Sequence, residues 1–186
     1  MEKRTSLELW CAAAATGEEP YSLLFTMLDY FAARSPQPEC RVLATDISTR
    51  ALKIAQEGVF SAERFAETPR AWKTKYLLQG QGRFDGFFRV RPEVARNVEF
   101  RKLNLVEPFN PGRSFPLIAC RNAMIYFDRP TQERVVTRLA LFLEPAGYLF
   151  IGHSESVTNR TGTLRFVRPA IYQKHMPTSV AKESQS

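Results

Sequence analysis

Four polar side chains lie at or just beyond the ends of segments made of small or apolar residues. They are Glu19, Asp46, Arg121 and Asn122. Carboxylate, guanidinium and amide groups recognise hydroxyl groups, ammonium groups and nucleobase edges through hydrogen bonds. Because ligands of open α/β sheets bind beyond the carboxyl ends of the strands, these residues predict one binding site for a small polar ligand.

The segment 12–17 indicates which kind of ligand this is. It is rich in alanine and lacks the GxGxxG pattern, so it does not supply the glycine conformations of a pyrophosphate-binding turn. A dinucleotide is therefore disfavoured, and a nucleoside without phosphates fits better. Asp46 is placed to accept hydrogen bonds from both ribose hydroxyls, and Asn104 to read an adenine edge.

Three of these residues also have a purely structural interpretation, whereas a binding role is favoured for Arg121, Asn122 and Tyr126, because an Arg next to an apolar segment needs a partner. Glu19 has capping-box spacing from Thr16, so it can be the third residue of a helix. Asp46 can cap the helix that follows it, and Asn104 can cap a turn. The residue types alone leave these alternatives open.

Nucleophilic and metal chemistry have little support. Cys11, Cys40 and Cys120 have no CxxC or CxxH spacing, which favours buried, reduced thiols over a zinc site or disulfides. His153 follows an apolar segment without the partners of a catalytic triad, so we expect a structural or supporting role, and His175 is expected in solvent. No metal site is predicted.

Strands and helices alternate along the sequence, which indicates an α/β domain with a mostly parallel sheet. Ser48 is expected to cap the second helix, Gly58 to end it, and Asp128 with Pro130 to open the third. Pro145 to Gly147 is expected to end that third helix. Strands are predicted at residues 7–11, 41–46, 98–103, 115–120, 148–151 and 170–172.

Residues 59–97 interrupt this alternation. Two short apolar segments flank a loop with Gly80 and Gly82, which predicts an inserted β-hairpin. We therefore expect a core formed by residues 1–58 and 98–174, a β-subdomain at 59–97, and a loose tail at 175–186.

Composition limits the class of protein. The chain has 186 residues, 44% of them hydrophobic, with a net charge of +7 and a pI near 9.6. These values suit one globular domain that binds acidic partners, and they exclude collagen, coiled coil and disorder. The sequence has no run long enough to span a membrane and no signal-peptide pattern, so we expect a cytoplasmic monomer.

Five segments resemble the motifs of the CheR-type chemotaxis receptor methyltransferases. They are WCAAAATGEEPYS at residues 10–22, ATDI at 44–47, NL at 104–105, CRNAMIYFD at 120–128 and GYLFIGHSE at 147–155. The resemblance extends from Leu9 to Lys174. It implies a Rossmann-like class I methyltransferase that uses S-adenosylmethionine to methylate glutamate side chains on the cytoplasmic domains of chemoreceptors.

The resemblance also implies roles for individual residues. Tyr126 and Arg121 would be catalytic, with Tyr126 near the methyl group and the substrate carboxylate. Cofactor contacts would fall on Ala13, Glu19, Asp46, Asn104, Leu105, Arg121 and Asn122. The insertion resembles the subdomain that docks a pentapeptide at the receptor's C-terminus, through Gly80, Gly82, Gly86 and Arg89.

Three departures from the family pattern stand out. Ala15 replaces the usual Ser or Thr, and Pro116 replaces an Asp that commonly starts the fourth strand. The family's N-terminal helical domain, with its Thr-x-Phe-Phe-Arg segment, has no counterpart here, so we expect a fragment or a shortened relative. A non-catalytic module that binds S-adenosylmethionine or receptors is therefore an alternative. A nucleic-acid methyltransferase is disfavoured, because no aromatic-rich basic groove or Asp/Asn-Pro-Pro-Tyr/Phe motif is found.

The expected chemistry agrees with these residues. A glutamate carboxyl has an ordinary pKa of about 4.3, so it is ionised at neutral pH and needs no general base. We expect in-line attack of the carboxylate on the methyl group, with Arg121 and Tyr126 orienting the reactants. The basic residues between Arg64 and Arg101 can form the surface that faces the receptor; a solvated charged surface is the alternative.

Overall fold

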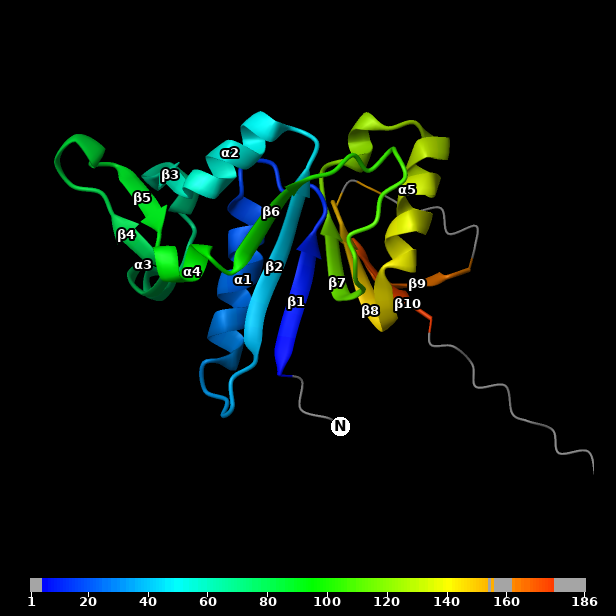
Figure 1. Ribbon diagram of the computed structural model, residues 1–186, viewed down its shortest axis with the longest axis horizontal. Helices are drawn as coiled ribbons and strands as arrows, with labels where there is room; N and C mark the ends of the chain where they lie inside the picture. Colours follow the sequence, from blue (N-terminus) through cyan, green and yellow to red (C-terminus); the bar gives the residue numbers. More distant parts are fainter. Residues whose placement is uncertain (1–4, 154, 156–161, 176–186) are drawn as a thin grey trace, which may run out of the picture.

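A seven-stranded mixed sheet forms the centre of the molecule (Figure 1). The computed structural model describes residues 5–153, 155 and 162–175. In spatial order the strands are β6 (Val98–Lys102), β2 (Glu39–Asp46), β1 (Ser6–Cys11), β7 (Phe115–Cys120), β8 (Leu143–Ile151), β10 (Ile171–Lys174) and β9 (Leu164–Arg168). The first five are parallel, while β10 runs antiparallel to both β8 and β9. This confirms the predicted α/β architecture.

The alternation of side chains along the strands divides the core between the two faces of the sheet. On one face, Val42 and Ala44 pack with Leu24 of helix α1 (Glu18–Phe31). On the other, Leu43 and Ile118 belong to the cluster that includes the buried residues of helix α5 (Arg129–Leu141). Helix α2 (Thr49–Glu57) follows β2 and contributes buried Leu52 and Ala55.

The insertion between α2 and β6 forms a second, three-stranded antiparallel sheet beside the edge of the main one (Figure 1). Its order is β3 (Val59–Ser61), β5 (Phe87–Val90) and β4 (Leu77–Gln79). The predicted hairpin is β4 with β5, whereas β3 was not predicted. The insertion also contains four short helices, which are η1 (Ala62–Phe65), α3 (Arg70–Tyr76), η2 (Gly82–Phe84) and α4 (Pro92–Ala95).

Both predicted caps of α2 and the predicted cap of α5 are present. The Ser48 side chain accepts a hydrogen bond from the Ala51 N–H, and Gly58 ends α2 in the left-handed conformation. Asp128 accepts from the Thr131 N–H at the start of α5.

Three details of the prediction are wrong. Helix α1 begins after Gly17 without a side-chain cap, so the Thr16–Glu19 capping box does not form. Helix α5 already ends at Leu141, and residues 145–147 lie inside β8, where the pairing with β7 shifts next to Pro116. Strand β9 was missed. Beyond His175, the predicted tail lies outside the described residues.

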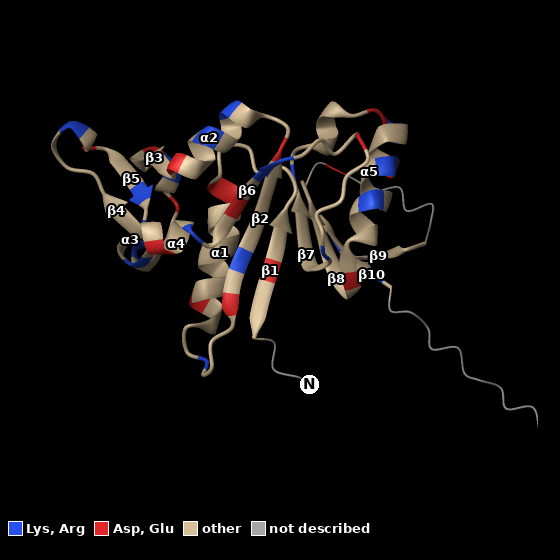
Figure 2. Ribbon diagram, in the orientation of Figure 1, with Lys and Arg blue, Asp and Glu red and all other residues tan. Residues whose placement is uncertain are grey.

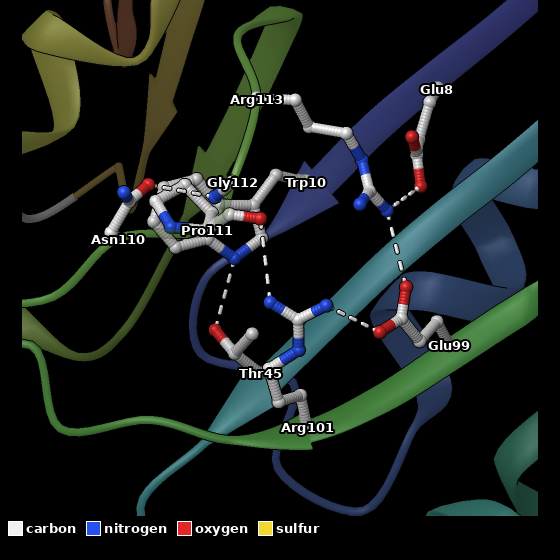
Figure 3. Close-up of polar contacts among 9 residues, drawn as sticks. All are labelled: Glu8, Trp10, Thr45, Glu99, Arg101, Asn110, Pro111, Gly112 and Arg113. Carbon is white, nitrogen blue, oxygen red and sulfur yellow. Dashed lines mark hydrogen bonds and ion pairs between the residues drawn. The ribbon is translucent and has the colours of Figure 1, made fainter.

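The connection from β6 to β7 contains no helix in the structure, and charged residues cover this part of the sheet instead (Figure 3). Arg113 contacts Glu8 of β1 and lies 3.1 Å from Glu99 of β6. Arg101 donates a 3.3 Å hydrogen bond to the Pro111 carbonyl and also pairs with Glu99. This network ties the connection to two strands, β1 and β6. Among the described residues, no helix is long and apolar enough to cross a membrane.

Candidate functional site

Strand register brings the predicted site residues to one edge of the sheet. Cys11 of β1 is opposite both Ala44 of β2 and Ala119 of β7. Two residues further along the chain, Asp46 ends β2, while Ala13 and Arg121 lie just beyond the ends of β1 and β7, so all three are at the carboxyl ends of adjacent strands. Since neighbouring strands are about 4.8 Å apart, these three backbones lie within about 10 Å.

The loop that follows β1 is fixed to both neighbouring strands. The Ala12 N–H donates to the Ala119 carbonyl at 2.7 Å, and the Ala14 N–H donates to the Thr45 carbonyl at 2.9 Å. Inside the core, Thr45 Oγ1 accepts a 3.0 Å hydrogen bond from Trp10 Nε1 (Figure 3) and donates to the Ala12 carbonyl. The loop is therefore shaped by its neighbours rather than by a glycine-rich sequence.

Asp46 organises this loop through both carboxylate oxygens. Oδ2 accepts a 2.9 Å hydrogen bond from the Ala15 N–H, and Oδ1 accepts a 2.8 Å hydrogen bond from the Ser48 N–H. An ionised carboxylate has about four lone-pair sites, so these two bonds leave capacity for a ligand. In the structure, the side chain that caps helix α2 is that of Ser48 and not that of Asp46.

Glu19 forms a contact that links the first helix to the loop after β7. Its Oε1 is 3.1 Å from Arg121 Nη1, and its Oε2 accepts a 3.3 Å hydrogen bond from the Cys11 thiol. The two charged side chains are 20% and 43% exposed, so each remains accessible to a ligand. The structure thus brings together two residues that are 102 positions apart.

Asn104 and Leu105 follow β6, beside the end of β2. The Asn104 side-chain oxygen accepts a 3.0 Å hydrogen bond from the Val106 N–H, which is the turn-capping arrangement. Leu105 is buried in the core cluster with Trp10. Contact of either residue with an adenine ring stays a prediction.

The loop after β7 carries the remaining site residues. Asn122 adopts a left-handed backbone conformation with φ of 58°, and Tyr126, in the short turn η3 (Met124–Tyr126), is 81% exposed. Glu155, to which the sequence analysis gave no role, accepts hydrogen bonds from the backbone N–H groups of Asn122, Met124 and Ile125. Backbone donors leave no side-chain pattern, so composition offered no signal for this contact.

A cavity of about 750 Å³ opens beside the Glu19–Arg121 pair. It lies between α1 and the face of β7, β8 and β10, and Phe150, Ile171 and His153 also line it. Asp46, Asn104 and Asn122 are not among its lining residues. The cavity therefore belongs to the Glu19 end of the edge.

The cysteines are unsuited to nucleophilic chemistry, because burial stabilises their neutral thiols. Burial and then the Glu19 carboxylate raise the pKa of Cys11 well above its ordinary value. Burial, followed by Glu155 and Glu19, raises the pKa of Cys120 to about 12. The prediction of buried thiols is confirmed for all three cysteines. Within the described part of the chain, no His, Cys, Asp and Glu cluster suits a metal ion.

The predicted docking residues all lie in the insertion and are separate from the sheet edge described above. Gly80 is required by close packing, because a Cβ there would lie 2.0 Å from the Phe84 carbonyl oxygen. Gly82 and Gly86 have positive φ and open surroundings. Arg89 lines a separate cleft of about 350 Å³ between the insertion and β6.

Comparisons with known proteins agree on one family. Residues 1–172 match the model for the CheR methyltransferase SAM binding domain. The chain is 39% identical over 173 residues to chemotaxis protein methyltransferase 2 of Pseudomonas aeruginosa, covering 92% of this chain and 61% of that protein. It is 44% identical over 150 residues to the chemotaxis protein methyltransferase of Klebsiella aerogenes, covering 80% of this chain and 51% of that protein.

The fold has a solved counterpart at low sequence identity. A TehB-like SAM-dependent methyltransferase from Corynebacterium glutamicum superposes with a TM-score of 0.52 and 14% identity, covering 94% of this chain and 80% of that one. The chain thus spans 61% and 51% of the length of the two chemotaxis proteins compared above. With its sheet order, inserted subdomain and matched residues 1–172, the chain belongs to the CheR methyltransferase family through its SAM-binding domain.

Proposed function

We propose that this chain binds S-adenosylmethionine at the edge formed by Glu19, Asp46 and Arg121 and transfers its methyl group to glutamate side chains of chemoreceptors. The observation that carries the proposal is the strand register, which gathers the alanine loop, the Asp46 carboxylate and the Arg121 guanidinium at the carboxyl ends of β1, β2 and β7. Glu19 adds a second carboxylate there from helix α1, through its 3.1 Å contact with Arg121. This is the edge where open α/β sheets bind ligands.

The residues at this edge fit the chemical groups of the cofactor. The Asp46 carboxylate accepts hydrogen bonds from the Ala15 and Ser48 N–H groups. Its remaining lone pairs can accept hydrogen bonds from the two ribose hydroxyls. Glu19, next to the 750 Å³ cavity, offers a carboxylate to an ammonium group, while Arg121 can pair with a carboxylate. The methyl side chains of the four alanines at 12–15 let a ligand approach the backbone closely.

S-Adenosylmethionine would supply a sulfonium methyl group for an ionised glutamate carboxylate, with the S–CH3 bond broken and S-adenosylhomocysteine as the leaving group. The protein's contribution is then to position the carboxylate and to remove water from it, since no proton has to be abstracted. Arg121 is suited to orient a carboxylate and Tyr126 to offer its hydroxyl beside it. The raised thiol pKa values agree with this assignment, because no cysteine is available as a base or nucleophile.

The insertion is the surface we assign to receptor docking. Its residues 59–97 contain eight Lys or Arg residues and four Asp or Glu residues. Figure 2 shows Lys and Arg on its outer loop, on β5 and around α3. An excess of positive charge favours encounter with an acidic receptor segment, and the attraction weakens as salt increases.

Calorimetric titration with S-adenosylhomocysteine tests the binding half of the proposal. We expect the Asp46→Ala variant to bind on the order of tenfold more weakly, because it loses the ribose acceptor and loosens the loop. Asp85→Ala is the matched control, since Asp85 is exposed in the insertion. Equal affinities in both variants would remove Asp46 from the site.

Methyl transfer to receptor-containing membranes tests the catalytic half. We expect incorporated methyl groups that are released as methanol by alkali, which identifies a carboxyl ester. Cofactor binding without transfer would instead support the non-catalytic module. Competition by nucleic acid would point to the third, disfavoured function.

A further inference from the structure

We infer that Glu155 is a positioning residue, which holds the loop at 121–126 in the form that presents Arg121, Asn122 and Tyr126. The inference rests on the proposed function of those three residues. The inference extends the proposed function by assigning a positioning role to the Glu155 carboxylate. This carboxylate lies in the loop after β8 and need not touch either reactant.

The contacts of Glu155 join the two loops at the carboxyl ends of β7 and β8. Its Oε2 accepts hydrogen bonds from the N–H groups of Gly152, at 2.6 Å, and Asn122, at 3.2 Å. Its Oε1 accepts from those of Met124, at 2.9 Å, and Ile125, at 3.3 Å. One half-buried side chain therefore satisfies four backbone donors, three of them in the loop of the site.

These donors need an acceptor that only a carboxylate provides in full. Asn122 has a left-handed backbone, and Met124 and Ile125 begin the turn η3, where N–H groups have no partner within the turn. A glutamine at this position would have one oxygen and one NH₂ group. The NH₂ group is a donor, so it cannot accept hydrogen bonds from the backbone N–H groups that it would face. The loop would then lose part of its support.

Gly152 shows that the backbone is built around this carboxylate. A Cβ at Gly152 would lie 2.7 Å from Glu155 Oε2 and 3.1 Å from its Cδ. The backbone of Gly152 does not have positive φ, so alanine is compatible with its conformation. The Gly152→Ala substitution should therefore displace the tip of the Glu155 side chain, and it also crowds the Asn122 backbone nitrogen, which would lie 3.2 Å from the new Cβ.

A second side chain holds the opposite, carbonyl side of the loop. Gln132 of α5 donates hydrogen bonds to the carbonyls of Met124, at 2.8 Å, and Phe127, at 3.0 Å. Met124 is buried, whereas Tyr126 projects into solvent with 81% of its surface exposed. Tyr126 thus has little packing of its own, and its position depends on the backbone contacts on both sides of it.

Amide hydrogen exchange measured by NMR tests whether the contacts exist in solution. We expect slow exchange at Asn122, Met124 and Ile125 in the unmodified protein, and exchange on the order of tenfold faster in Glu155→Gln and Gly152→Ala. Glu155→Asp keeps both oxygens and should recover part of the protection. Glu39→Gln, an exposed change at the far end of β2, is the control.

Kinetics then separate positioning from general support. In Glu155→Gln, we expect kcat for methyl transfer to fall on the order of tenfold to a hundredfold, because small displacements of reacting groups have effects of this size. The affinity for S-adenosylhomocysteine should fall much less, because Asp46 and Glu19 are untouched. We expect the fold-decrease in affinity to be smaller than the fold-decrease in kcat by a factor of about ten or more. Gly152→Ala should show the same split, and the double variant should be no worse than either change alone.

Unchanged exchange at 122–125 in both variants would overturn the inference, whatever the activity. Faster exchange with unchanged kcat would also overturn it, because the loop would then be held without consequence for transfer. If the unmodified protein transfers no methyl group, the proposed function fails, and the positioning role of Glu155 fails with it. The exchange data would still report separately on the hydrogen bonds themselves.

Discussion

Gly17, at the start of α1, provides a sharp test of how the site is packed. It has φ of +102°, and a Cβ added there would lie 2.8 Å from Ala55 Cβ and 3.0 Å from Ala55 Cα. The obstacle is the backbone and short side chain of α2, which cannot rotate away. We therefore expect Gly17→Ala to push α1 and α2 apart just before Glu18 and Glu19.

The expected loss of stability has two parts. An L-residue with this backbone conformation costs about 1–2 kcal/mol, and crowding of a packed contact costs about 1–3 kcal/mol. Gly112→Ala is the matched control, because Gly112 also has positive φ, +87°, but nothing lies within 4 Å of its Cβ. The difference between the two variants isolates the crowding.

Urea unfolding followed by tryptophan fluorescence measures this difference. Trp10 is fully buried, so its emission reports on the core next to the site. We expect Gly17→Ala to lose about 1–3 kcal/mol more than Gly112→Ala, which corresponds to a further fall in Tm of roughly 2–12 °C for a chain of this size. Equal losses in the two variants would refute the packing described for the α1–α2 contact.

Two further predictions concern titratable groups. Because burial holds the pKa of Cys120 at about 12 and that of Cys11 well above its ordinary value, both thiols should resist a disulfide reagent in the folded protein and react fully in denaturant; rapid reaction of the folded chain would show that the core is open. The hydrogen bonds at Thr131 lower the pKa of Asp128 below its ordinary value of 3.8, so its carboxylate stabilises the folded chain above that pH and loses this effect as pH falls through the lowered pKa. The stability difference between the unmodified protein and Asp128→Asn should accordingly be present at neutral pH and shrink in acid, and a difference independent of pH would contradict the capping role.

The general architecture was predictable because strong local signals mark it. The segments that became β1, β2 and β7 are mostly apolar, and Ser48, Gly58 and Asp128 each have a local capping function. The insertion was recognisable from its glycines and from the interruption of the α/β alternation. These features depend on neighbours in sequence, which is why sequence alone predicts them.

The errors arose where distant contacts override local preference. Thr16 and Glu19 have the spacing of a capping box, but in the structure Glu19 pairs with Arg121 and Thr16 bonds to Glu18. The Pro145–Gly147 segment has a turn-like composition, yet it continues β8 as an irregularity opposite Pro116. Strand β3 has only three residues, too few for a periodic pattern.

The site divides in the same way. Glu19, Asp46 and Arg121 were predicted to lie at one edge of a parallel sheet. The register brings the carboxyl ends of β1, β2 and β7 together, and Glu19 reaches Arg121 from helix α1. Glu155 was missed because its partners are backbone N–H groups of a distant loop, which any sequence would supply. The same reasoning explains Gly152, whose small size matters through the Glu155 carboxylate and the Asn122 backbone nitrogen that approach it.

A crystal structure of this chain grown with S-adenosylhomocysteine tests the central claim most directly. The account predicts electron density for one molecule across the carboxyl ends of β1, β2 and β7, with its ribose at Asp46 and its amino-acid end beside Glu19 and Arg121. Density at the 350 Å³ cleft lined by Arg89, or a ribose bound away from Asp46, would contradict it.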